Sequence, residues 1–157
     1  IDIISKKLLT LLVFKMNMKI TAMSIPLYEY NMKVRDYECD AQGIVNNANY
    51  QHYYEVVRHE FLEKHGLNFY ELHEKGIDAV VVSVYIRYKH SLRGANDFIC
   101  TVDSIEKEGI RYIFNQKIIR LRDSKVCSTA RVETACMVNG KVGKPELFDK
   151  ALSKYLQ

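Results

Sequence analysis

The chain has 157 residues, a mass of 18.3 kDa, 48% hydrophobic residues and 27% charged residues. This length suits one domain of ordinary size, and the composition excludes a mainly disordered or fibrous protein. The 23 basic and 19 acidic residues are spread along the chain and leave a net charge of only +4. Nothing in this charge indicates a nucleic-acid partner, and none is predicted.

Residues 1–23 differ from the rest of the chain because they carry a short leucine-rich stretch between lysines. A membrane-spanning helix needs roughly 20 consecutive apolar residues, so no membrane span is predicted. We expect an extension that is disordered or not native, followed by a single domain over 24–157. The four cysteines have neither metal-ligand spacing nor the density of a disulfide-stapled secreted domain. We therefore expect free thiols, a cytoplasmic location, no metal and no cofactor.

The first half of this domain predicts a strand and a long helix. Alternating apolar residues over 27–36 indicate the strand, and a turn-rich segment follows over 36–47. Over 47–65 the apolar residues recur at helical spacing. An asparagine is available to cap the first turn of this helix, and Gly66 is placed to end it.

The second half predicts four strands and a final helix. The strands are expected over 77–89, 98–106, 110–122 and 126–138. Short polar connections make the last three of them antiparallel neighbours. A helical turn is expected over 69–75, and a helix with Pro145 in its first turn over 145–155.

These elements predict an α+β fold in which an antiparallel five-stranded sheet wraps around one long central helix. A helix that is apolar along one side must be covered, and the sheet is the element large enough to cover it. The sheet has a second face that also needs burial. We therefore expect a homo-oligomer, either a dimer or a dimer of dimers (homotetramer).

The segment between the first strand and the helix carries the candidate chemistry. Asp40 lies in a tight turn that contains Gly43, and the helix begins about seven residues after Asp40. The first turn of a helix presents unpaired backbone N–H groups and the positive end of the helix dipole, which suits the stabilisation of an oxyanion. A turn or capping role for Asp40 is the alternative.

A family resemblance is carried by Asp40-x-x-Gly43-Ile44-Val45, by Tyr50 and by the run 54–62 with Gly66. With these motifs the sequence resembles the 4-hydroxybenzoyl-CoA thioesterase family of hotdog proteins over about 27–139. The resemblance implies the hotdog fold and the hydrolysis of an acyl-CoA thioester. It also implies that Asp40, in the turn that contains Gly43, is catalytic, and that the backbone N–H of Asn47 polarises the thioester carbonyl.

A single carboxylate suits this chemistry because a thiol, with a reference pKa of ~8.5, leaves without much help from a general acid. An aspartate, with a reference pKa of ~3.9, is ionised at neutral pH and either attacks the carbonyl carbon or takes a proton from water. The sequence leaves both routes open. It also leaves open which acyl group is cleaved and whether coenzyme A or a carrier protein carries it.

Residues of the helix and basic residues near strand ends are further candidates for substrate contacts. They are Tyr50, Tyr54, Glu55, Lys89, Arg93 and Arg111. The basic side chains are candidates for the CoA phosphates on charge alone, and a solvated strand end is their alternative role. For the tyrosines, packing of the helix is the alternative. Glu55 is a reserve catalytic carboxylate, because some hotdog enzymes outside this family use one from the helix.

Three other functions compete with acyl-CoA hydrolysis. Hotdog dehydratases pair a histidine with an acidic residue, and no histidine occurs between residues 24 and 51. An acyl-ACP thioesterase would use the same residues as an acyl-CoA thioesterase. A non-catalytic acyl-CoA-binding module would need neither Asp40 nor Gly43, so the presence of both favours an enzyme.

Overall fold

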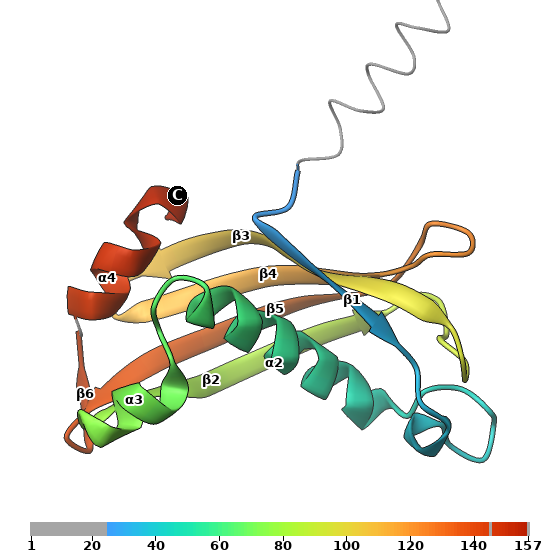
Figure 1. Ribbon diagram of the computed structural model, residues 1–157, viewed down its shortest axis with the longest axis horizontal. Coiled ribbons are helices and arrows are strands. Elements are labelled where there is room, and N and C mark those ends of the chain that lie inside the picture. Colours follow the sequence, from blue (N-terminus) through green and yellow to red (C-terminus); the bar gives the residue numbers. More distant parts are fainter. Residues whose placement is uncertain (1–24, 145, 157) are drawn as a thin grey trace, which may run out of the picture.

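The structure, a computed structural model, describes residues 25–144 and 146–156. One antiparallel sheet dominates it (Figure 1). Its strands are β1 (Tyr28–Lys33), β2 (Ile77–Tyr88), β3 (Asp97–Glu108), β4 (Arg111–Arg120), β5 (Lys125–Val138) and β6 (Lys141–Gly143). The predictions for residues 1–23 and for Pro145 lie outside the described residues.

The strands lie in the order β1-β3-β4-β5-β2, and the short β6 pairs with the end of β5. The prediction of five strands was therefore wrong by one. A turn at Asn139 and Gly140, both with positive φ, returns the chain so that Lys141–Gly143 pairs with the last residues of β5. The hairpins β3–β4 and β4–β5 are confirmed as antiparallel neighbours.

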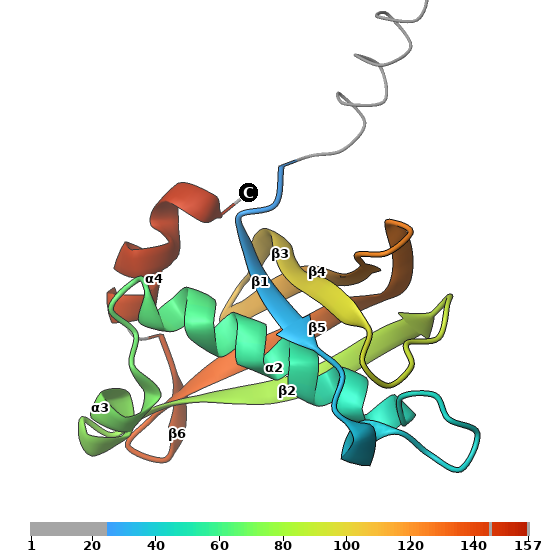
Figure 2. The same ribbon diagram turned by 45° about the vertical axis from the view of Figure 1, so that its right-hand side comes forward.

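Three α-helices accompany the sheet in the described part of the chain: α2 (Asn47–Glu63), α3 (Phe69–Glu74) and α4 (Glu146–Leu152). Single 3₁₀ turns, η1 (Asp36–Glu38) and η2 (Ser153–Tyr155), complete the set. Figure 2 shows that α2 lies along one face of the curved sheet, while α3 and α4 lie toward one end of it. The helix predicted as central is thus the longest of three, and none of the three has the length and apolar character of a membrane-spanning helix.

The apolar side of α2 explains its position on the sheet. Tyr50, Tyr54, Val57 and Phe61 recur at helical spacing, and all four are buried in the core between helix and sheet. Burying each such side chain contributes roughly 1.5–3 kcal/mol to folding. Because β2 runs beside α2, its last residue, Tyr88, arrives next to the first turn of the helix and helps to form the site there.

Candidate functional site

The loop that contains Asp40 is held by its own backbone. The N–H of Asp40 donates to the carbonyl of Ile44, and the N–H of Gly43 donates to the carbonyl of Asp40, both at 2.9 Å. Gly43 has a φ of +70°, which glycine adopts at the least cost. One carboxylate oxygen of Asp40, Oδ1, accepts a hydrogen bond from the Gln42 N–H at 2.8 Å. The turn therefore fixes the Asp40 carboxylate through Oδ1, while Oδ2 accepts no hydrogen bond from the residues that the structure describes.

The first turn of α2 leaves one backbone donor without an acceptor. The N–H of Val45 donates to the Leu92 carbonyl, the N–H of Asn46 to the Glu38 carbonyl, and the N–H of Ala48 to the Asn46 side chain, at 2.9–3.0 Å. Within residues 25–144 and 146–156, the N–H of Asn47 donates to no acceptor. This N–H belongs to the positive end of the helix dipole, so it is available to a negatively charged oxygen.

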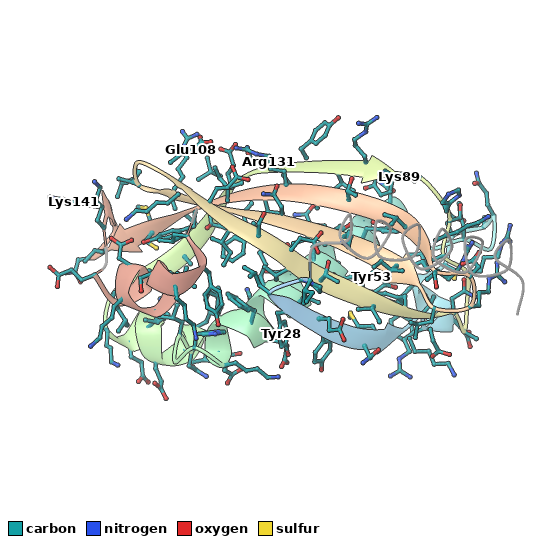
Figure 3. All side chains as sticks on the ribbon, turned by 90° about the horizontal axis from the view of Figure 1, so that it is seen from above. Tyr28, Tyr53, Lys89, Glu108, Arg131 and Lys141 are labelled. Carbon is teal, nitrogen blue, oxygen red and sulfur yellow. The ribbon has the colours of Figure 1, made fainter. Side chains whose placement is uncertain are left out.

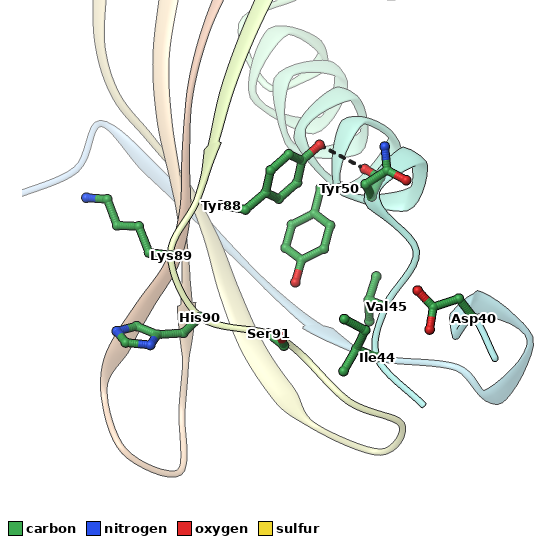
Figure 4. Close-up of a pocket in the computed structure, with 9 residues that line it drawn as sticks. Asp40, Ile44, Val45, Tyr50, Tyr88, Lys89, His90 and Ser91 are labelled. Atoms are coloured by element: carbon green, nitrogen blue, oxygen red, sulfur yellow. Dashed lines mark hydrogen bonds between the residues drawn. The ribbon is translucent and has the colours of Figure 1, made fainter. Parts of the chain in front are cut away.

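Asp40 and Asn47 both line one cavity of about 320 Å³ at this end of α2. Asp40 and Asn47 form a polar part of the cavity wall, and Tyr50 and Tyr88 form an aromatic part. Figure 4 shows the Asp40 carboxylate turned toward the side of the cavity where Val45 and Tyr50 lie. The rest of the lining is Ile44, Val45, Lys89, His90 and Ser91.

Two tyrosines join the helix start to the strands. The Tyr88 hydroxyl donates to the Asn47 carbonyl at 3.2 Å, and the Tyr50 hydroxyl accepts from the Leu92 N–H at 3.1 Å. Their rings meet edge to face with centroids 5.2 Å apart. Burial raises the pKa of Tyr50, which favours the neutral phenol, and its hydroxyl donates to no acceptor among the described residues.

Arg120 secures the segment that closes the cavity. Its side chain is 7% exposed, and its Nη1 donates to the Ser91 carbonyl at 2.6 Å. Its Nε and Nη2 donate to the Asp123 carboxylate at 2.9 and 2.7 Å. The turn between β4 and β5 therefore fixes the loop that carries Ser91 and Leu92. Leu92 in turn hydrogen-bonds Tyr50 through its N–H and Val45 through its carbonyl.

Comparison with known proteins identifies the family. Residues 34–156 match the model of the thioesterase-like superfamily, which is more than half of the chain. The chain belongs to this superfamily. The predicted resemblance, and with it the prediction of a thioester hydrolase, is confirmed.

Among the relatives of this thioesterase-like chain, a putative esterase of Aquifex aeolicus is 31% identical over 72% of the chain and 87% of the relative. A chloroplastic acyl-acyl carrier protein thioesterase of Arabidopsis thaliana is 34% identical, but the match covers 60% of the chain and only half of the relative. An acyl-CoA thioesterase of Haemophilus influenzae is 29% identical over 78% and 89% of the two chains.

A solved structure supports the hotdog-like architecture. A protein from Staphylococcus aureus, described in complex with CoA, is 20% identical to the thioesterase-like chain. The two align with a TM-score of 0.76 over 85% of each chain. At this identity the likeness concerns the fold.

The remaining predicted residues of the thioesterase-like chain lie at various distances from this cavity. Lys89 lines it, but its side chain extends away from Asp40 (Figure 4). The Arg93 Nη1 lies 3.9 Å from the position that a Cβ atom on Gly43 would occupy, so Arg93 is next to the turn that contains Gly43. Arg111 lies near the far end of β4, where it forms an ion pair with Glu133 at 3.1 Å. The structure therefore brings Lys89 and Arg93 near the candidate site and leaves Arg111 outside it.

Two predicted helix residues also lie outside this cavity. Tyr54 is 1% exposed, and its hydroxyl hydrogen-bonds Ser128 at 2.6 Å, so within this chain it is a core residue. Glu55 borders a second cavity farther along α2. Tyr88, Ser91 and Arg120 were not singled out from the sequence; the only local signal was the position of Tyr88 at the end of a predicted strand.

Proposed function

We propose that this thioesterase-like protein hydrolyses acyl-CoA thioesters at the cavity between Asp40 and the first turn of α2. The observation that carries the proposal is that Asp40 and Asn47 line the same cavity, while the N–H of Asn47 donates to no acceptor among the described residues. One group supplies negative charge for attack, and the other supplies a donor for the oxygen that becomes negative. An enzyme that cleaves thioesters needs these two functions in one place.

In the proposed reaction, the thioester carbonyl oxygen accepts a hydrogen bond from the Asn47 N–H. Asp40 either attacks the carbonyl carbon, giving an anhydride that water then cleaves, or takes a proton from the water that attacks. In both routes the C–S bond breaks, the sulfur leaves as a thiolate that acquires a proton, and water supplies the new oxygen of the acid. The Tyr50 phenol, which donates to no acceptor among the described residues, supplies a second donor in this proposal.

Coenzyme A is the favoured carrier of the acyl group. The acyl-CoA thioesterase of Haemophilus influenzae aligns over most of both chains, whereas the plant acyl-carrier-protein enzyme aligns over half its length. Lys89 and Arg93 provide positive charge near the cavity for the phosphates of CoA. The 34% identity to the plant enzyme makes an acyl-carrier-protein substrate the second candidate.

The test is the release of free thiol from a panel of acyl-CoAs, with the same acyl groups on a carrier protein as a second series. We expect turnover of acyl-CoA by the wild-type protein and a loss of at least a hundredfold in Asp40→Asn, which keeps the shape of the side chain and removes its charge. Asp36→Asn is the matched control, because Asp36 lies in η1 outside the cavity lining. Wild-type rates in Asp40→Asn would remove Asp40 from the mechanism, and no thiol release from either series would leave a non-catalytic module.

The proposed assembly is a homo-oligomer that pairs through the edge strand β2. This strand ends the sheet order, and its exposed side chains are unusually apolar: Val80, Val81, Val82 and Tyr85 are 40–63% exposed. An uncovered apolar edge strand favours association with a second copy. Sedimentation analysis is expected to give a dimer or a dimer of dimers. Val82→Lys is expected to shift the assembly toward monomer, and a monomeric wild-type protein would contradict the proposal.

A further inference from the structure

Arg58 is a buried cation without a buried counter-charge. It lies in the second half of α2, and its side chain is 5% exposed. Its Nη1 donates to the Gln116 Oε1 at 3.0 Å, and it forms no ion pair with a carboxylate of the described residues. Burial lowers the pKa of Arg58 to about 10, which still leaves the guanidinium charged at neutral pH.

The other nitrogens of this guanidinium open onto a cavity. Every fully enclosed side-chain nitrogen or oxygen in the described part of the chain has a hydrogen-bond partner. Nε and Nη2 of Arg58 have no hydrogen-bond partner among the described residues, so these two donors are not fully enclosed by them. Arg58 also lines a cavity of about 50 Å³.

This cavity combines apolar walls with several polar side chains, because Glu55, His59, Tyr112 and Thr134 line it together with Arg58. Leu62, Phe69, Phe114 and Phe148 form much of the wall. The volume is enough for a small group, because a single water needs roughly 10–15 Å³ of such space. An acceptor placed there would meet the Arg58 donors beside buried apolar side chains, and a hydrogen bond from a charged guanidinium is stronger than one between neutral groups.

The Arg58 cavity and the candidate catalytic cavity lie at two points of the same seam between α2 and β2. Tyr88 lines the catalytic cavity, Ala79 lines the Arg58 cavity, and Val84 and Ile86 of β2 pack against the core between them. In Figure 3, Lys89, which follows Tyr88, lies toward the end of the molecule opposite Lys141. Lys141 belongs to β6, which pairs with the end of β5, and the same residues of β5 pair with the start of β2.

The spacing along α2 defines the length of chain that would join the two cavities. Asn47 and Arg58 are eleven residues apart, which is ~16 Å along a helix axis. An extended acyl chain covers ~3.5 Å in three single bonds. Because the Arg58 side chain leans back toward the helix start, the distance to be spanned is somewhat shorter than the helix length. Roughly ten to thirteen chain atoms therefore span it.

We propose that the Arg58 cavity receives the far end of the acyl group and that this end carries an oxygen that accepts hydrogen bonds from Arg58. The inference rests on the proposed thioester hydrolysis for the position of the near end. The acceptor is a carboxylate, a hydroxyl or a keto oxygen. A plain hydrocarbon end would leave two donors of a buried guanidinium without an acceptor, which is a costly arrangement, whereas an oxygen would satisfy them.

The experiment compares acyl-CoAs of ten to fourteen carbons that end in a methyl, a hydroxyl or a carboxylate group. For wild-type protein we expect kcat/KM to favour an oxygen-bearing end over the methyl end by roughly ten- to a hundredfold at the matching length. Arg58→Met, which keeps the stem of the side chain, is expected to lose this ratio while the methyl-ended substrate is turned over within threefold of wild type. Arg131→Met is the matched control, because Arg131 is a partly exposed arginine on the sheet.

A binding measurement makes the result independent of catalysis and of folding. By calorimetry, wild-type protein is expected to bind a free dicarboxylic acid more tightly than the monocarboxylic acid of the same length, and folded Arg58→Met to bind both alike. If thiol release fails but this difference in binding holds, the proposed function is wrong and the subsite stands. If the wild-type protein shows the same kcat/KM and the same affinity for methyl-ended and oxygen-ended chains, the proposed subsite is wrong. The same conclusion follows if Arg58→Met, or Arg58→Lys should the former not fold, keeps the wild-type ratio.

Discussion

At its first turn α2 is held by backbone hydrogen bonds from two loops, whereas from Val57 onward it is held by side chains packed against the sheet. At the first turn Asn46, Asn47 and Ala48 are exposed, and the polar groups of the turn are aimed by bonds to Glu38 and Leu92. In the second half Val57 and Phe61 are fully buried. The helix therefore has one end that borders the candidate site and a second half that anchors the fold.

This difference indicates that rate and stability are separable along one helix. Removing a donor or a charge at the first turn deletes no packed side chain. Removing an aromatic ring from the second half opens a cavity in the core but leaves the groups around Asp40 in place. The following changes are ordered by the free energy that each is expected to change.

Phe61→Ala is expected to change stability most. Phe61 contacts Tyr28, His65 and Tyr155 with ring centroids 4.4–6.0 Å apart. A buried phenylalanine replaced by alanine costs roughly 3–5 kcal/mol of unfolding free energy. Urea denaturation measures the loss, and Tyr70→Ala, at a side chain that is 87% exposed, is the control. Folded Phe61→Ala with a strongly reduced kcat would show that the two halves of α2 are not separable.

Asn47→Pro is expected to lower the rate with little effect on stability. Proline lacks the N–H, yet it is well tolerated at the first helical position, and the extended ψ of Asn46 (138°) suits a residue before proline. Loss of one oxyanion donor costs ~10²–10³ in kcat. Asn47→Ala keeps the N–H and is expected to retain wild-type activity in the thiol-release assay. Equal rates for the proline and alanine variants would exclude this N–H from catalysis.

Arg120→Gln is expected to lower kcat by roughly tenfold, because the loop carrying Ser91 would lose its anchor to the β4–β5 turn. The effect should lie in kcat more than in KM, since the change displaces Leu92 and its partner Tyr50 rather than removing a substrate contact. Arg122→Gln, an exposed neighbour, is the control. A purely structural role would instead lower the melting temperature and leave kcat of the folded enzyme unchanged.

His59→Gln is expected to give the smallest effect, a change in how stability depends on pH. Burial lowers the pKa of His59, so below its ordinary value of 6.5 the unfolded chain binds a proton that the folded chain does not. Stability is therefore lost as pH falls below about 6.5. In melting experiments between pH 7.5 and 5, the variant should lose less stability than the wild type. Identical pH profiles would exclude this contribution.

The elements of the fold were predictable because they depend on local periodicity. The stripe from Tyr50 to Phe61 predicts α2 within two residues of its ends, and the alternation of the long strands predicts their hairpins. The strand β6 was missed because three residues after a turn show no period. The Asp40 turn was predictable for the same local reason, through Gly43 and the helix that follows it.

The walls of the candidate site were less predictable. Tyr88 and Ser91 reach the cavity because β2 ends beside the first turn of α2, and Arg120 reaches Ser91 across 29 positions of sequence. From the sequence alone, Arg58 is indistinguishable from the exposed charged residues of the helix, and only the structure shows that it is buried. These positions depend on pairing between strands that are distant in sequence, and no local pattern in a single sequence predicts that pairing.

The most direct test of the account is a crystal structure of the wild-type protein with an acyl-CoA analogue in which a methylene group replaces the thioester sulfur. The account predicts that the ketone oxygen lies about 3 Å from the Asn47 nitrogen and that an Asp40 carboxylate oxygen, or a water bound to it, lies about 3–3.5 Å from the carbonyl carbon. A carbonyl bound away from the first turn of α2, with Asp40 facing solvent, would contradict it.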